Sequence, residues 1–434
     1  MARNRMPATL SFLLAARRCE LHDMEDLART CELVILVGDL VHALQKERGY
    51  SNLFLRHAQP QMAPVLAALQ EEALQAEIKT RGLLGGLVPD EALPIMGKTR
   101  LFNCIAYALH RLDEAMDLRW RVRERRIESQ EATAQFTRLI ASLLAVVFEA
   151  ADTALDPDVT RTLVALFNFM QGKELSGQER ALGVVGYAAG YFTDAQKARM
   201  RELAESQGRC FGIFAEYAPP DALQRWEQTQ YDSAPVQRMR AMAQQTSPEQ
   251  AIDGGLSELW YDIATARIDA MRAVAMLLAQ GLARLCRQRI ADTREELDNH
   301  RLLMSRFTDQ AGSETPTQLF NVQARPIDAP LQDGLASGTE RAMLDIMREQ
   351  RLRMDRYDAD LARARSALDE RKTIEQAKWL LVHHRKLSEQ AAHTLLQQTA
   401  MKNSLSLAEV ARRVLSEISD ADQAQDGADT PAGH

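Results

Sequence analysis

Residues 370–415 read ERKTIEQAKWLLVHHRKLSEQAAHTLLQQTAMKNSLSLAEVARRVL, and this stretch decides the organisation of the C-terminal part of the chain. Its apolar residues recur at the three- and four-residue spacings of amphipathic helices. Ser406 and Glu409 form a capping box that opens the last helix. We therefore predict a unit of three short helices. Their buried faces are expected to consist of Ile374, Ala377, Leu381, Ala391, Ala392, Leu395, Leu396, Leu407, Val410, Ala411, Val414, Leu415 and Ile418.

The same stretch is basic within an acidic protein. From Arg371 to Arg413 there are eight Lys or Arg against three Asp or Glu, a net charge of +5, whereas the 434-residue chain as a whole carries −7. Arg371, Lys378 and Arg385 are seven residues apart, so they line up on one helix face. Charge segregation of this kind favours a polyanionic partner, and it predicts nucleic-acid binding.

Upstream of this unit, residues 340–370 carry a heptad pattern. Spacings of three and four residues alternate, which keeps one stripe of side chains facing a partner helix. The stripe consists of Met347, Gln350, Met354, Tyr357, Leu361, Ala364 and Leu368. We predict a coiled-coil helix that pairs two copies of the chain as a homodimer.

Three spacings in the C-terminal unit carry a family resemblance: an Ala-Lys pair at 377–378, an AxxxLxxxAM helix at 392–401 and an LAEVA helix at 407–411. Together they resemble the ANTAR domain, an RNA-binding module of bacterial transcription antiterminators. The remaining matches are Arg371, Ile374, Leu380, Leu381, Leu387 and Ser388. The chain departs from the family's usual Gly, Tyr and Arg by having Trp379, His393 and Gln397.

The ANTAR resemblance implies that residues 371–418 bind leader RNA hairpins, whose unstacked loop bases are the usual target of sequence-specific recognition. Cations would contact phosphates, and an imidazole would stack on a base. The expected phosphate contacts are Arg371, Lys378, Arg385, Lys386 and Lys402, and the expected stacking residue is His393. The alternative is a ligand-controlled DNA-binding regulator, in which residues 406–415 enter the major groove as part of a helix-turn-helix.

The rest of the chain also has the composition of helices. Aromatic residues make up only 6% of it and alternation with a period of two is nearly absent, which predicts an all-α fold. Breaks rich in Pro, Gly or Ser separate the helical segments, at 59–60, 82–94, 155–157, 190–193, 219–220, 233–235 and 247–255.

The segment from Glu258 to about Phe307 has no clear stop, and a helix of that length is expected to act as an output rod from a helical domain at residues 1–308. Residues 309–339 have a linker composition. Residues 419–434 are acidic and poor in large apolar side chains, so we expect a disordered tail there.

Two similar stretches lie within the N-terminal helical domain: QKERGYSN at 45–52 and KELSGQERALG at 173–183. Their glycines each cost a helix about 1 kcal/mol relative to Ala, which indicates close backbone approach or room for a ligand. With Trp260 and further residues they resemble the NIT domain, a helical nitrate- and nitrite-sensing module, over roughly residues 30–290. The further residues are Val236, Met239, Arg240, Tyr261, Thr265, Arg267 and Ile268.

The NIT resemblance implies anion sensing by Arg48, Arg180 and Arg240. A guanidinium presents a planar fork of donors that suits two oxygens of nitrate or nitrite at once. An anion arriving between two helices that carry buried arginines could draw them together, which would provide a switch. The two resemblances jointly imply a nitrate- or nitrite-responsive transcription antitermination regulator that acts on leader RNA and, indirectly, on transcribing RNA polymerase.

Other classes of protein lack support in the sequence. There is no paired-carboxylate, Ser-His-Asp or Gly-rich phosphate motif, so we expect no catalysis and no cofactor. The five cysteines are far apart and no His has metal-ligand spacing, which favours a reducing cytoplasm and no metal site. The apolar stretch 139–151 is too short to span a bilayer, so no membrane association is expected.

Overall fold

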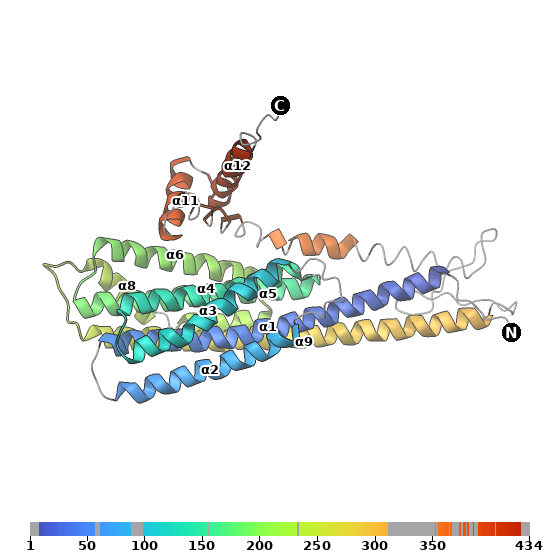
Figure 1. Ribbon diagram of the computed structural model, residues 1–434, viewed down its shortest axis with the longest axis horizontal. Coiled ribbons are helices and arrows are strands. Elements are labelled where there is room, and N and C mark those ends of the chain that lie inside the picture. Colours follow the sequence, from blue (N-terminus) through green and yellow to red (C-terminus); the bar gives the residue numbers. More distant parts are fainter. Residues whose placement is uncertain are drawn as a thin grey trace, which may run out of the picture. The chain divides into compact units, whose positions relative to one another are not determined.

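In the computed structural model, the described residues are 8–56, 61–87, 99–154, 156–231 and 234–310, and, with gaps, 352–426. The chain divides into two compact units, Met1–Asp358 and Ala359–His434. Every regular element among the described residues is a helix (Figure 1), so the expectation of an all-α fold is confirmed.

Nine helices are described in the first unit. They are α1 (Ala8–Arg56), α2 (Met62–Leu87), α3 (Thr99–Arg123), α4 (Ser129–Thr153), α5 (Pro157–Ala189), α6 (Asp194–Tyr217), α7 (Pro220–Tyr231), α8 (Ala234–Gln245) and α9 (Leu256–Gln310). Most ends of these helices fall at or beside the breaks expected from Pro, Gly and Ser, but the break between α3 and α4 at residues 124–128, where Arg125 has a φ of 52°, was not expected. The expected long helix is present as α9, which has 55 residues.

Local chemistry explains where α5 begins and ends. The side chain of Asp156 accepts the backbone N–H groups of Asp158 and Val159, and Pro157 occupies the first turn, where its missing N–H is harmless. Gly190 ends the helix with φ of 81°, a left-handed conformation that glycine adopts without a steric penalty. These two caps fix the helix that carries the second Glu-Arg motif.

Helix α5 is the centre of the first unit. It packs against α1, α4, α6, α8 and α9, while α1 also packs against α2, α4 and α9. Figure 1 shows α1 and α9 running side by side over much of their length. Because α5 is covered from so many directions, most of its residues are buried, including four charged ones: Lys173, Glu174, Glu179 and Arg180.

Glycines let large side chains from neighbouring helices lie directly on α5. A Cβ at Gly172 would be 2.6 Å from the ring of Phe211, and one at Gly183 would be 2.8 Å from Cδ1 of the Trp260 indole. The indole N–H of Trp260 donates to the carbonyl of Arg180 at 2.9 Å. Close approach of α6 and α9 to α5 therefore depends on positions without a side chain.

The second unit contains a small apolar core. The described residues between 373 and 385 are helical, and they are followed by α11 (Glu389–Asn403) and α12 (Leu407–Asp426). The predicted capping box is present, because Ser406 N–H donates to Glu409 Oε2 at 2.8 Å and Glu409 N–H donates to Ser406 Oγ at 3.2 Å. The core consists of Ala377, Leu381, Ala392, Leu396, Ala400, Val410 and Ala411, with Ile374, Leu395, Leu405, Leu407, Val414 and Leu415 packed around it.

Two expectations for this part of the chain differ from the structure. Ala391 is exposed, since the buried face of α11 begins with Ala392. Residues 419–426, expected in a disordered tail, continue α12 as far as Asp426, because the stretch contains no Gly or Pro before Gly427.

Several expected features lie outside the described residues. They are the linker beyond residue 310, the tail beyond 426, the side chain of Ile418, and the coiled-coil positions Met347, Gln350, Met354, Ala364 and Leu368. Of the expected stripe, Tyr357 and Leu361 lie in a helical stretch at 355–363 and are half-buried. The coiled-coil dimer remains a prediction.

The packing of Trp260 on Gly183 can be tested against a glycine on a free surface. Gly183→Ala should destabilise the protein by about 1–3 kcal/mol, because a buried indole must move. Gly208→Ala on α6, where a Cβ would meet nothing within 4 Å, should instead stabilise it by up to about 1 kcal/mol. Urea unfolding measures both, and equal effects of the two substitutions would contradict this account of the helix packing.

Candidate anion site and nucleic-acid surface

The two Glu-Arg motifs meet where α1 packs against α5. Arg48 on α1 is 1% exposed and Arg180 on α5 is 2% exposed. A Cβ at Gly177, on α5, would be 2.5 Å from Nη2 of Arg48, and a Cβ at Gly49, on α1, would be 2.8 Å from Cζ of Arg180. Each helix therefore supplies a glycine against which the other helix's guanidinium lies, which explains why these helices contain glycine there.

Arg48 is paired with a carboxylate. Its Nη1 donates to Glu174 Oε1 at 2.6 Å and its Nη2 donates to Glu174 Oε2 at 3.1 Å. Thr137 on α4 accepts a further bond from Arg48 Nη1 at 3.0 Å. Gln45 and Gln178 also donate to Glu174, at 2.9 and 3.0 Å. The charge of Arg48 is thus balanced within the protein, in the bidentate geometry that a guanidinium prefers.

Arg180 has no such partner: within the described part of the chain it forms no ion pair with a carboxylate. Its Nη2 donates to the carbonyl of Gln45 at 3.0 Å and its Nη1 donates to the hydroxyl of Thr265 at 2.8 Å. Its Nε is buried without a hydrogen-bond partner. The ring of Tyr261 lies 5.1 Å from its Cζ. Burial lowers the pKa of Arg180, because a charged guanidinium is less stable away from water.

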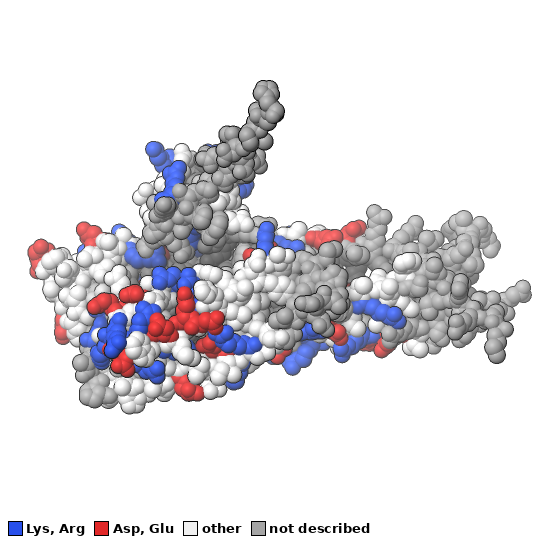
Figure 2. All heavy atoms as spheres, viewed as in Figure 1, with Lys and Arg blue, Asp and Glu red and all other residues white. Residues whose placement is uncertain are grey.

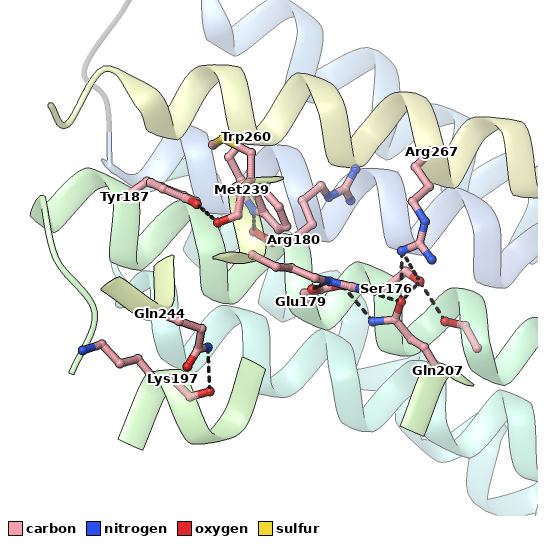
Figure 3. A network of polar contacts seen from close by, with 12 residues as sticks. Ser176, Glu179, Arg180, Tyr187, Lys197, Gln207, Met239, Gln244, Trp260 and Arg267 are labelled. Carbon is pink, nitrogen blue, oxygen red and sulfur yellow. Dashed lines mark hydrogen bonds and ion pairs between the residues drawn. The ribbon is translucent and has the colours of Figure 1, made fainter. Parts of the chain in front are cut away.

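Arg240 lies in a neighbouring polar network, part of which is drawn in Figure 3. From α8, its Nε and Nη2 donate to the buried carboxylate of Glu179 at 2.5 and 2.7 Å, and Nη2 also donates to Gln207 at 3.0 Å. Arg267 on α9 donates to the same Gln207 oxygen at 2.9 Å and to Ser176 at 3.4 Å. Burial lowers the pKa of Arg267 to about 10.

Arg48 and Arg180 lie close together in the structure, whereas Arg240 contacts Glu179, the residue next to Arg180. Glu179 and Arg180 are adjacent on α5, so Arg240 reaches the region through its carboxylate partner. Glu47, the acid of the first motif, pairs with Arg119 on α3 at 3.0 Å and not with the second motif. Burial raises the pKa of Glu47, although its ion pair with Arg119 opposes that shift. The two motifs are therefore similar in sequence but differ in their partners.

Sequence reasoning missed Glu174 and Glu179, the carboxylates that form ion pairs with two of the three candidate arginines. It also missed Thr265 and Gln45 as partners of Arg180. One signal was available: between Val159 and Tyr187 the polar residues of α5 point in several directions among small and apolar ones. A helix without a continuous polar face must bury its charges, and buried charges need partners from other helices.

The predicted RNA contacts in the second unit divide into described and undescribed residues. Arg385 and Lys402 are exposed and Lys378 is half-buried. Arg371, Lys386 and the side chain of His393 lie outside the description. Figure 2 shows basic side chains on the described surface of this unit, whereas acidic and basic side chains are interspersed on the visible face of the first unit. Arg412 and Arg413, not singled out from the sequence, are also exposed.

A helical domain that buries an arginine without a carboxylate, continued by a long helix and by a small basic three-helix unit, defines a ligand-responsive regulator. The family model described as "Nitrate and nitrite sensing" matches residues 39–283, and the model described as "ANTAR domain" matches residues 362–415. The chain belongs to the NIT–ANTAR family of nitrate-responsive transcription antitermination regulators. The ANTAR match favours RNA over the duplex DNA of the helix-turn-helix alternative.

Two individual proteins are similar along nearly the whole chain. The "Nitrate regulatory protein" of Klebsiella oxytoca is 32% identical over 409 residues, which are 94% of this chain and 95% of the relative. A solved structure titled "Structure of the NasR transcription antiterminator" aligns with a TM-score of 0.58 at 27% identity, covering 95% of this chain and 100% of the other.

One described helix, within Ser129–Asp152 of α4, is long and apolar enough to cross a membrane by length and composition alone. This 24-residue segment is longer than the apolar stretch at residues 139–151. Of its most apolar window, 56% is buried inside the protein, and the core helix of a soluble protein passes the same test. The finding is weak support for a membrane span.

The different charge balance of Arg48 and Arg180 predicts different effects on stability. Arg48→Met leaves the buried carboxylate of Glu174 without its cation and should cost about 3–5 kcal/mol. Arg180→Met removes a cation that has no carboxylate and should change the unfolding free energy by no more than about 1 kcal/mol. Urea unfolding in nitrate-free buffer compares the two. A loss in Arg180→Met as large as that in Arg48→Met would show that Arg180 is already compensated.

Proposed function

We propose that nitrate or nitrite binds at Arg180, between α1, α5 and α9. The observation that carries this proposal is a fully buried guanidinium with no carboxylate partner and an unused Nε donor. A small monoanion would supply the missing charge and accept the missing hydrogen bond. Because buried charges interact strongly, the site can hold a weakly basic anion that a surface arginine would leave to water.

Arg48 would contribute a second positive charge to the anion site. It lies near enough to lower the pKa of Arg180 further, after the larger effect of burial. Its own donors are taken up mainly by Glu174, so Glu174 competes with the anion for Arg48. Arg240 is held in the same way by Glu179 and Gln207, and its contact with an anion requires that pair to open.

Binding at Arg180 would act on the output helix directly. Thr265 and Tyr261, which contact Arg180, both belong to α9, while Gln45 belongs to α1. An anion that draws the donors of Arg180 away from these groups changes how α9 packs on α1 and α5. A ligand can shift a conformational equilibrium only through such differential contacts.

In the second unit, we propose that Arg385 and Lys402 contact leader-RNA phosphates, together with Arg371, Lys378 and Lys386, while His393 stacks on a base. A homodimer formed through residues 340–370 would present two such surfaces to paired hairpins and gain affinity from effective concentration. The transcribing RNA polymerase would be affected through the leader RNA, without a direct contact, in the cytoplasm.

Calorimetric titration with nitrate tests the anion site. Arg180→Met should abolish the binding heat, whereas Glu174→Gln should strengthen binding because a competing carboxylate is removed. Arg209→Met on α6, an exposed arginine, is the matched control and should bind like the unaltered protein. Unchanged nitrate affinity in a folded Arg180→Met protein would exclude this site.

Binding of a tandem-hairpin leader RNA over a range of salt concentrations tests the basic surface. Arg385→Gln and Lys402→Gln should each weaken binding and lower the slope of log K against log salt by about 0.7–0.9, the amount expected for one lost phosphate contact. Lys79→Gln, on the surface of α2, should leave both unchanged. Tighter binding of duplex DNA than of the hairpins at matched salt would overturn the RNA assignment.

A further inference from the structure

A small cavity lies beside the arginine site, where α1, α5 and α9 meet. Its volume is about 50 Å³. One part of the lining is polar and includes His42, Gln45, Lys173 and Arg272. The other part is apolar and consists of Val34, Ile35, Val41, Leu166, Met170, Ala275, Met276 and Ala279. The cavity thus combines hydrogen-bond donors with an apolar wall, as small-molecule sites do.

Lys173 is the unusual residue of this cavity. It is 4% exposed, and its only hydrogen bond among the described residues is the one between Nζ and Nδ1 of His42, at 2.9 Å. Neither residue is paired with a carboxylate there. Arg272, which is half-buried, has no ion pair within the described part of the chain either. A lysine and an arginine therefore line one cavity without a carboxylate in contact with either, so an added carboxylate would find two nitrogen donors that lack an acidic partner.

The charges around the cavity favour a monoanion. Burial, with smaller effects of Arg272 and Arg180, lowers the pKa of Lys173 to about 7, and Asp269 and Glu174 oppose the shift. Burial, followed by the nearby Lys173, Arg272, Lys46 and Arg180, lowers the pKa of His42 to about 2, so His42 is neutral and can only share a proton of Lys173. Asp39, the acid in the cavity lining, is exposed at the rim.

We propose that this cavity is a second ligand site, separate from the anion site at Arg180, and that it takes a short-chain monocarboxylate. The carboxylate would lie between Lys173 and Arg272, and the alkyl group would lie against the apolar wall formed by Met170 and Ala279. The volume has room for about four groups the size of a water molecule, which suits acetate or propionate and excludes long chains.

Gln45 connects the two sites. It lines the cavity, donates to Glu174, and offers its backbone carbonyl to Arg180. Its side-chain Oε1 is buried without a hydrogen-bond partner. A carboxylate in the cavity would therefore be separated from the proposed nitrate site at Arg180 by Gln45, and it would contact the same three helices, α1, α5 and α9. The physical consequence is that the two ligands influence each other's affinity.

Calorimetric titration of the full chain with formate, acetate, propionate and hexanoate at pH 8 tests the proposal. Affinity should rise by about fourfold for each buried methylene as far as propionate, and it should fall for hexanoate. Binding should take up about one proton, measured in two buffers of different ionisation enthalpy, because Lys173 regains its proton when the carboxylate arrives. Affinity independent of chain length, or binding without proton uptake, would overturn the proposal.

Two variants locate the site. Lys173→Met should weaken propionate binding at least tenfold, and it should fold well because it removes a buried amine that lacks a carboxylate partner. Ala279→Leu should weaken binding by filling the apolar part, with every charge retained. The exposed Lys79→Met is the matched control and should bind normally. Unchanged propionate affinity in both cavity variants would place the carboxylate elsewhere and overturn the proposal.

Nitrate titrations of the same variants keep the two sites distinguishable. Lys173→Met should retain nitrate affinity within about fivefold, the lower end of ordinary coupling between two sites. Arg180→Met should lose nitrate binding and retain propionate binding. If Lys173→Met abolishes nitrate binding and propionate competes with nitrate at a single site, the cavity belongs to the nitrate site and the second-site proposal is wrong.

Discussion

The burial of charged residues in α5 is the constraint on which the rest of the first unit depends. A charge held away from water must be matched by a partner, and on α5 the partners come from other helices. Glu174 is matched by Arg48 from α1, and Glu179 is matched by Arg240 from α8. The ion pairs therefore tie α1 and α8 to defined positions along α5. Arg180 breaks the pattern because its partners are neutral.

The buried charged residues on α5 and around it include more cations than carboxylates, and this excess of positive charge links the fold to the proposed function. A protein that completed every ion pair would have no physical reason to respond to a small anion. Here the unmatched cation touches residues of α1 and α9, the two longest described helices. In the proposed function, the response to the anion arises from buried cations that lack a carboxylate partner, Arg180 and the nearby Lys173.

Most helix ends and the small C-terminal core were predictable because their causes are local, although the break between α3 and α4 was missed. Asp156 beside Pro157 and the capping box at Ser406 act within one turn, so the sequence alone identifies them. The partners of the arginines were not predictable in this way. Arg48 and Glu174 are 126 residues apart, and nothing in either motif selects that pair over others. Family resemblance indicated Arg48 and Arg180, while their unequal charge balance required three-dimensional structure.

The uninterrupted length of α9 has a mechanical consequence. From Thr265, which touches Arg180, to Gln310 the helix rises by about 68 Å at 1.5 Å per residue. In the proposed function, α9 would act as a lever that is held near its N-terminal end by the contacts of Arg180. A tilt of about 2° there would move the far end by about 2 Å, over a lever of this length. If the anion binds at Arg180 as proposed, sub-ångström changes around that guanidinium would be magnified along α9 into a displacement large enough to separate or join packed side chains.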